Sequence, residues 1–164
     1  MSIEKVVINA SPFILLCKCG LIELLPQLFL EIEMPESVSE EIIRGADIAS
    51  DCIYDCEKTW LSRCLAPHSK EVLAWNLGDG ETEVLSVVSA NKETYTALVD
   101  DRAARKCALA LGINTLGTAG ILILAKKRGL IPAVLPELHK LRDAGMWLPD
   151  ETFSVILNEA GELK

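Results

Sequence analysis

The chain has 164 residues, half of them hydrophobic, and a formal net charge of −8 at pH 7. This length suits one domain that buries roughly 68–70% of its unfolded surface, so a substantial core is expected. The negative charge argues against broad, non-specific binding of nucleic acid, which needs a surplus of Lys and Arg, but it leaves room for a local basic rim around an acidic site.

Six cysteines are distributed along the chain, and we expect reduced thiols because no secretory signal precedes them. Cys17 with Cys19, and Cys52 with Cys56, lack the matched second pair of a zinc site, and the two histidines stand alone. Free cysteine is among the residue types most often buried. We therefore expect cysteines that serve as small core side chains in a cytoplasmic protein.

The segment from Cys107 to Ala125 carries no charge and needs to be weighed as a membrane span. Glycine, asparagine and threonine interrupt it repeatedly, whereas a spanning helix needs about 20 predominantly apolar residues. We interpret the segment as a helix end, a strand and a new helix, and we expect no contact with a membrane.

The chain alternates between patterns typical of buried strands and of amphipathic helices. Val6–Ile8 is an apolar, β-branched run and predicts the first strand. Ser11 and Pro12 then predict a helix start, with Ser at the cap and Pro at the first helical position. The apolar segment that follows is interrupted by Gly20 and Pro26, which predicts two short helices.

An acid on an apolar helix face follows a second short strand, predicted at residues 32–35. Ser37 or Ser39 is expected to cap a helix in which Glu41 shares a face with Val38 and Ile42. An acid on such a stripe indicates either a salt bridge or a functional site, and the sequence leaves both open.

A second acid of this kind opens a later helix, which begins near Gly80. Glu81 lies on the same helical face as Val84 and Val88, whereas Glu83 is rotated away. Stabilisation of a helix N-terminus is enough to explain Glu83. It explains Glu81 less well, because the face of Glu81 has to pack inward.

The most informative stretch is an apolar run, predicted as a strand at residues 96–99, that stops at Asp100 and Asp101. A helix predicted at 103–111 follows at once, so the two acids lie at the carboxyl end of a short buried parallel strand. Ligands of open α/β sheets bind at that edge. Two carboxylates this close either need a cation or must hold a proton. We expect Glu41 and Glu81 to converge on this point.

The remaining pattern completes one α/β domain over residues 1–164. The turn from Gly117 to Gly120, which contains Thr118, is typical of either a phosphate cradle or a helix N-cap, and the sequence does not separate the two. The other predicted elements are helices at 46–59 and 69–75, a strand at 113–115, a helix at 121–125 that ends at Lys126 and Gly129, and C-terminal helices at about 135–144 and 150–160, packed on the domain.

These motifs occur in an order that resembles a known family. They are a strand followed by Asn9-Ala10-Ser11-Pro12, then Glu41, Gly78-Asp79-Gly80-Glu81, Val99-Asp100-Asp101-Arg102-Ala103-Ala104-Arg105 and Gly117-Thr118-Ala119-Gly120. The chain resembles a PIN domain over almost its whole length. More narrowly, it is similar to the bacterial and archaeal branch related to the VapC-type ribonuclease toxins.

The resemblance implies a three-layer α/β/α fold with a central, mainly parallel, twisted sheet, and acids that hold Mg²⁺ or Mn²⁺ for the hydrolysis of RNA phosphodiester bonds. It assigns catalysis and metal binding to acids, with the neutral Asn9 standing where the family usually has its first Asp. An amide oxygen can coordinate a hard cation, but it brings no charge. The implied metal-binding residues are Asn9, Glu41, Glu81, Asp100 and Asp101, of which the four acids are also the implied catalytic residues.

Further residues are implied to assist. Ser11 matches the Ser or Thr that supports the first acid of the family, and Thr118 is a second supporting residue. Arg102, Arg105 and Lys126 are candidate phosphate contacts, although surface solvation is the simpler account of each.

The leading functional expectation is a metal-dependent endoribonuclease that acts on RNA and is the toxin half of a toxin–antitoxin pair, neutralised by a small antitoxin protein. The alternative is a catalytically weakened PIN-like module that binds RNA or protein, because Asn9 removes one charge. A receiver-like phosphoacceptor ranks last, since it needs its acidic pair after the first strand. The apolar segments at 13–29 and 135–160 also lead us to expect a homodimer.

Overall fold

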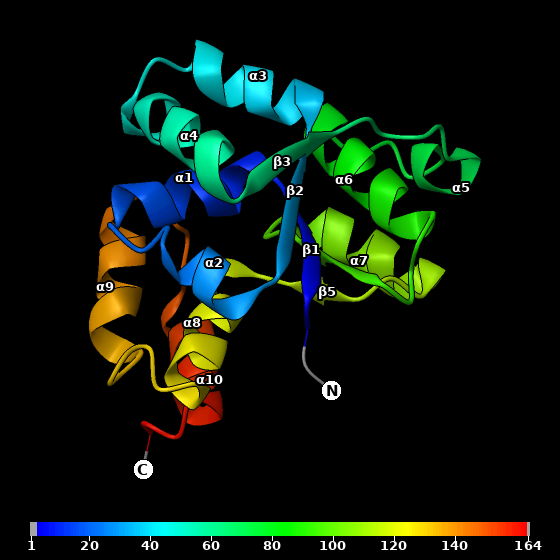
Figure 1. Cartoon of the computed structure of the whole chain (residues 1–164). Helices are drawn as coiled ribbons and strands as arrows, with labels where there is room; N and C mark the ends of the chain where they lie inside the picture. Colours follow the sequence, from blue (N-terminus) through cyan, green and yellow to red (C-terminus); the bar gives the residue numbers. More distant parts are fainter. Residues whose placement is uncertain (1–2, 164) are drawn as a thin grey trace.

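The computed structural model describes residues 3–163, and in them a five-stranded sheet separates two groups of helices (Figure 1). All strand pairs are parallel, and the strand order is β3-β2-β1-β4-β5. The strands are β1 (Lys5–Ile8), β2 (Glu31–Pro35), β3 (Leu61–Cys64), β4 (Tyr95–Leu98) and β5 (Thr115–Leu116). The helices are α1 (Ala10–Lys18), α2 (Leu24–Leu28), α3 (Glu36–Arg44), α4 (Ile48–Thr59), α5 (Lys70–Leu73), α6 (Asp79–Ser89), α7 (Arg102–Leu111), α8 (Thr118–Lys127), α9 (Leu135–Asp143) and α10 (Asp150–Glu159). The predicted three-layer α/β/α architecture is confirmed.

Two hydrophobic cores lie on the two faces of the sheet. Successive side chains of a strand point to opposite faces, so Val7 belongs to one core and its neighbours Val6 and Ile8 to the other. Helices α6 and α7 cover the face of Val7, and α1 and α8 pack against the opposite face (Figure 1). The C-terminal helices α9 and α10 add Leu138 and Phe153 to the latter core.

The strand order creates a switch point between β1 and β4. From β1 the chain builds outward through β2 and β3, then returns to the other side of β1 with β4 and β5. The register pairs Ile8 of β1 with Leu98 of β4, so the residues that follow these two strands emerge side by side. Such a switch point at the carboxyl ends of parallel strands is where open α/β sheets bind ligands.

Strand β3 was missed by the sequence patterns. Its four residues contain no β-branched side chain, and within it only Leu61 is buried. Pairing with β2, which sets Leu61 opposite Ile32, makes this segment an edge strand. Its strand state therefore depends on a neighbour more than twenty residues earlier in the chain rather than on local propensity.

Several predicted boundaries were wrong by small amounts. Helix α1 begins at Ala10 with Asn9 as its N-cap, so Ser11 does not cap it. Helix α3 begins directly after Pro35, and neither Ser37 nor Ser39 caps it. The Ser37 hydroxyl instead donates to the Glu83 carboxylate, and the Ser39 side chain is fully buried.

The C-terminal strand was also shifted. Strand β5 comprises Thr115 and Leu116 rather than residues 113–115, because the Ile113 amide still donates to the Ala108 carbonyl and closes the end of α7.

The six cysteines are free thiols, and three of them meet between α1 and α4. The Cys17 thiol donates to Cys52 Sγ at 2.9 Å, and Cys52 Sγ lies 3.9 Å from Cys56 Sγ. Burial raises the pKa of the Cys17 and Cys56 thiols well above the ordinary value, and the neighbouring Cys52 adds to the shift. Thiols that stay protonated in this way serve as small core side chains.

Two expectations concern the surface: the absence of a membrane span and the presence of a homodimer. Within residues 3–163, no helix is long and apolar enough to cross a membrane. The apolar segment 13–29 fills the core with side chains such as Phe13, Leu16 and Leu25 and contributes no large exposed apolar side chain. The other segment, 135–160, exposes Leu135, Trp147 and Val155, and the homodimer stays a prediction.

Candidate active site

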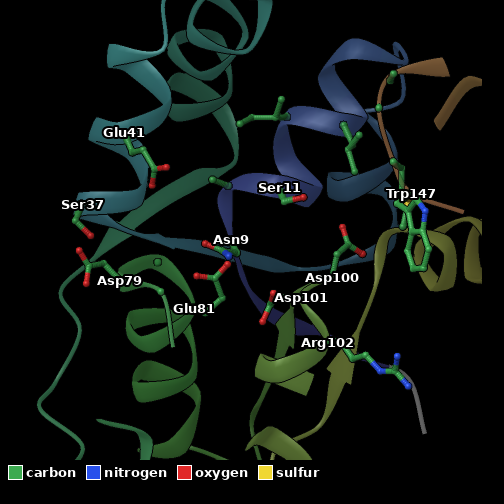
Figure 2. Close-up of a pocket in the computed structure, with 18 of the residues that line it drawn as sticks. Asn9, Ser11, Ser37, Glu41, Asp79, Glu81, Asp100, Asp101, Arg102 and Trp147 are labelled. Carbon is green, nitrogen blue, oxygen red and sulfur yellow. The ribbon is translucent and has the colours of Figure 1, made fainter. Parts of the chain in front are cut away.

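A cleft of about 1000 Å³ opens at the switch point, beyond the carboxyl ends of β1 and β4. Figure 2 shows the polar side chains that line it, with Asn9, Glu81 and Asp101 gathered in the middle from three different elements. The carboxylates and amide of the cleft belong to Asn9, Glu41, Asp79, Glu81, Asp100 and Asp101. The predicted convergence of the acids from distant parts of the sequence is therefore what the structure shows.

Asn9 lies inside this cleft, and its side chain lacks the hydrogen bonds that a buried amide usually makes. Its backbone amide donates to the Leu98 carbonyl at 3.1 Å, which ties the end of β1 to β4. Its side chain is 5% exposed, makes no capping hydrogen bond to α1, and leaves Oδ1 buried without a partner. Asn is a favoured N-cap residue, so a side chain that forgoes capping and stays unpaired at a cost of about 1–3 kcal/mol indicates a functional position.

Two glycines make room for the central side chains of the cleft. A Cβ on Gly80 would lie 2.7 Å from Asn9 Oδ1, and a Cβ on Gly78 would lie 2.5 Å from Glu81 Oε2. Neither glycine has a positive φ, so clearance rather than backbone conformation explains them. The segment from Gly78 to Glu81 thus brings the N-terminus of α6 close against Asn9.

The two adjacent acids after β4 have different surroundings. Asp100 accepts hydrogen bonds from the Thr118 amide at 2.7 Å and the Thr118 hydroxyl at 2.6 Å. Asp101 is exposed and caps α7 by accepting from the Ala104 amide at 2.9 Å through Oδ2. Both carboxylates therefore have separate hydrogen-bond donors, and Asp101 keeps one oxygen free toward the cleft.

The contacts of Thr118 show what the turn from Gly117 to Gly120 does, which the sequence left open between a phosphate cradle and a helix N-cap. Its side chain is fully buried, and its amide and hydroxyl are both occupied by Asp100. Gly117 gives the pair its clearance, since a Cβ there would lie 3.1 Å from Asp100 Oδ1. The turn therefore fixes the orientation of an acid of the cleft, which agrees with the supporting role expected for Thr118.

Glu41 and Arg44 stand on α3, at the rim of the cleft. Glu41 is exposed and forms no ion pair with another described residue, so the salt-bridge interpretation is not supported. Arg44 was not singled out from the sequence, although it lies three residues after Glu41 and therefore on the same helix face. Arg102 lines the cleft from the start of α7, so the cleft has an arginine on each of two helices, α3 and α7.

The contacts of Glu83 were also underestimated from the sequence. Burial raises the pKa of its carboxyl, and the charge of the nearby Asp79 acts in the same direction. It accepts a hydrogen bond from Ser37, which lines the cleft, and so joins α6 to α3; this is more than the helix-end stabilisation expected from the sequence.

Three other predicted residues have different outcomes. Ser11 lines the cleft, but its hydroxyl makes no hydrogen bond to Asn9 or to any other described residue. Arg105 lies in a neighbouring cavity rather than in the cleft. The prediction that Lys126 contacts phosphate is corrected. Its ammonium donates to the Ala160 carbonyl at 2.7 Å and to Glu162 Oε2 at 3.0 Å, so it binds the C-terminal segment.

The oxygen donors of the cleft fit a hard divalent cation in chemical type. Within residues 3–163 no three His, Cys, Asp or Glu side chains already form a cluster that could hold a metal ion. A complete cage is not required for Mg²⁺, which takes one or two carboxylates and keeps several waters. The unpartnered Asn9 Oδ1 together with Glu81 and Asp101 meets that requirement.

The comparison with protein families agrees with the fold. A family model described as a PIN domain matches residues 5–162. The comparison with curated proteins gave no match.

Proposed function

This chain belongs to the PIN-domain family, and on that premise we propose that it is a metal-dependent endoribonuclease that hydrolyses RNA phosphodiester bonds. PIN domains are commonly nucleases that use divalent metal ions. The observation that carries the proposal is the buried, unpartnered Oδ1 of Asn9 in a cleft whose other side-chain oxygens are mainly carboxylates. Ionised carboxylates accept hydrogen bonds and donate none, so the neighbouring acids cannot satisfy the Asn9 oxygen, whereas a bound cation would.

Asn9, Glu81 and Asp101 would hold Mg²⁺ or Mn²⁺ in the middle of the cleft, with Glu41 and Asp100 reaching it from either side. Such an ion would activate a water molecule and neutralise charge that develops on the phosphate. Thr118 positions the Asp100 carboxylate with two hydrogen bonds. Arg44 and Arg102 are placed at the rim, where they would bind phosphates of the substrate and offset the negative charge of the chain.

The biological role that we propose is that of the toxin in a toxin–antitoxin pair, neutralised by a small antitoxin protein. The resemblance to the VapC-type branch supports it, through the motifs around Glu81, Asp101 and Thr118. We also propose that the protein is a homodimer. Light scattering at tens of micromolar protein measures the molar mass in solution and so tests this directly.

Cleavage of single-stranded RNA by the purified protein tests the proposed activity. We expect cleavage with Mn²⁺ or Mg²⁺, none with a chelator, and a loss of at least about 100-fold in Asp101→Asn and Glu81→Gln, which corresponds to about 2.7 kcal/mol of transition-state stabilisation. Glu93→Gln is the matched control, because Glu93 is exposed and lies outside the cleft. Cleavage that persists in the chelator, or in both site variants, would exclude the assignment.

A second function has two observations in its favour. Asn9 is neutral, and the described acids do not form a ready-made cluster of three, which favours a module that binds RNA or protein without cleaving it. Binding of RNA with no cleavage at any Mn²⁺ or Mg²⁺ concentration, together with no gain in Asn9→Asp, would support the binding module instead.

A further inference from the structure

A second cavity, of about 590 Å³, adjoins the acidic cleft and shares Asp100, Arg102, Met146 and Trp147 with it. It runs between the start of α8 and the C-terminal segment that leads into α10. A ligand that extended from the cleft into this second cavity would therefore pass Arg102 and Trp147.

Trp147 is held in an exposed position by an ordered backbone. Its side chain is 85% exposed, whereas the next residue, Leu148, is buried. On one side the Met146 amide donates to the Leu141 carbonyl at 3.0 Å, and on the other the Leu148 carbonyl accepts from Arg142 Nη2 at 2.6 Å. Arg142 is itself packed over the Phe153 ring, at 4.3 Å from the ring centre. The backbone on both sides of Trp147 is thus held in place, and the indole is presented to solvent beside both cavities.

The position of Trp147 separates it from the other exposed apolar side chains. Single exposed apolar residues such as Leu30 and Leu109 are ordinary and lie in neither cavity. Among the described large apolar residues that are exposed, Trp147 alone lines both cavities. Figure 2 shows it on the side of the cleft from which Arg102 also extends.

Two guanidinium groups lie along this path. Arg102 lies at the junction of the two cavities, and Arg105 lines the second. Of the two acids in the second cavity, Asp100 has both carboxylate oxygens bound to Thr118, and Glu159 lies at the far end of α10. Aromatic side chains that stack on bases, together with basic groups that follow the backbone, are the usual means of binding single-stranded nucleic acid.

We propose that Trp147 stacks on a base of single-stranded RNA next to the bond held in the acidic cleft, with Arg102 and Arg105 binding the adjoining phosphates. The proposal rests on the proposed function, since it extends the same site to its substrate. Inside a duplex the neighbouring base pairs cover the faces of each base, so a side chain that stacks on a base next to the scissile bond favours a single-stranded substrate. Stacking on one aromatic residue is worth roughly 5- to 150-fold in affinity, from alanine substitutions in other proteins.

Equilibrium binding without metal tests the proposal independently of cleavage. Fluorescence anisotropy of a labelled single-stranded RNA of about ten nucleotides in chelator would be measured for the wild type, Trp147→Ala and Trp147→Phe. We expect Trp147→Ala to weaken binding at least fivefold, Trp147→Phe to retain most of the affinity, and Arg102→Ala to reduce the dependence of affinity on salt concentration. Trp75→Ala is the control, because Trp75 is exposed and lies in neither cavity.

The outcomes separate this proposal from the proposed activity. Binding that depends on Trp147 in a protein that cleaves no RNA with any metal would support the nucleotide site while the ribonuclease proposal fails. Metal-dependent cleavage with Trp147→Ala binding RNA as tightly as the wild type would overturn the nucleotide site. The nucleotide site would also be overturned if the wild type binds no RNA, or if it binds a blunt duplex as tightly as the single strand. A change in oligomeric state alone in Trp147→Ala would overturn it as well.

Discussion

Gly80 packs directly against the side chain of Asn9, so closely that a Cβ on Gly80 would lie 2.7 Å from Asn9 Oδ1. Gly80 is in the first turn of α6, and Asn9 follows β1, so the contact joins two elements about seventy residues apart. The close approach makes the position of the Asn9 amide depend on the absence of a side chain at residue 80.

Gly80→Ala should therefore separate stability from function. We expect the free energy of unfolding to change by less than about 1 kcal/mol, because the higher helix propensity of Ala offsets part of the cost of moving the Asn9 side chain. We expect the affinity for Mn²⁺ and the RNA cleavage rate to fall, because the new methyl group displaces the Asn9 amide. Urea denaturation, titration calorimetry and a cleavage assay measure the three quantities.

A double-mutant cycle with Asn9→Ala checks the cause of this effect. In the Asn9→Ala background the Gly80→Ala change should have little further effect on cleavage. Equal losses in both backgrounds would show that the methyl group acts through something other than Asn9.

Asn9→Asp should strengthen metal binding. One unit charge about 4 Å from another is worth roughly 4 kcal/mol at an effective dielectric of 20, and a divalent ion doubles the attraction. Desolvation and repulsion from Glu81 and Asp101 offset much of this gain, so we expect at least tenfold tighter binding of Mn²⁺ together with faster cleavage. Titration calorimetry on both proteins measures the difference, and equal affinities would remove Asn9 from the site.

The same substitution should lower stability in the absence of metal, because it places a charge at a position that is only 5% exposed. Added Mn²⁺ should then raise the melting temperature of Asn9→Asp more than that of the wild type, since the ion binds the folded state.

Thr118→Val should weaken the support of Asp100. The substitution keeps the backbone amide donor but removes the buried hydroxyl that donates to the carboxylate at 2.6 Å. Hydrogen bonds to charged groups contribute about 1.5–3 kcal/mol, so we expect a loss of about 2 kcal/mol in the free energy of unfolding and slower cleavage. Thr118→Ser keeps the hydroxyl and should restore most of the activity. If the serine and valine variants cleave at the same rate, the hydroxyl does not position Asp100.

Glu162→Gln should change how stability depends on pH. Burial works to raise the pKa of the Glu162 carboxyl, but hydrogen bonds from the Val134 amide, the Lys126 ammonium and the Leu135 amide outweigh it and hold the pKa below the ordinary value of 4.5. A lowered folded-state pKa stabilises the protein above the unfolded pKa, and this contribution is lost as the pH falls through the folded pKa.

The wild type should therefore exceed Glu162→Gln by about 1–2 kcal/mol at pH 7, and the gap should close below about pH 4.5. Urea denaturation across this range measures the gap, with Glu151→Gln as a control because Glu151 is exposed on α10. A gap that stays constant with pH would mean that the ionised carboxylate contributes nothing specific.

Local patterns in the sequence were enough for the central strands and for the place of the cleft. The apolar runs before Asn9 and Asp100 were predicted as buried parallel strands, and the helices that carry Glu41 and Glu81 followed from helical periodicity. Once two such strands lie side by side, their carboxyl ends share one edge, so the convergence of these acids was predictable.

Only the tertiary structure decided which partner each side chain meets. Strand β3 exists because β2 pairs with it, Thr118 binds Asp100 across eighteen residues, and Lys126 turns away to Glu162. The exposed position of Trp147 depends equally on contacts of its neighbours with α9. Periodicity along the chain records whether a side chain is buried, because burial is a property of one position on one element. Hydrogen bonds and cavities are made by two segments together, so they were decided only when the helices and strands packed.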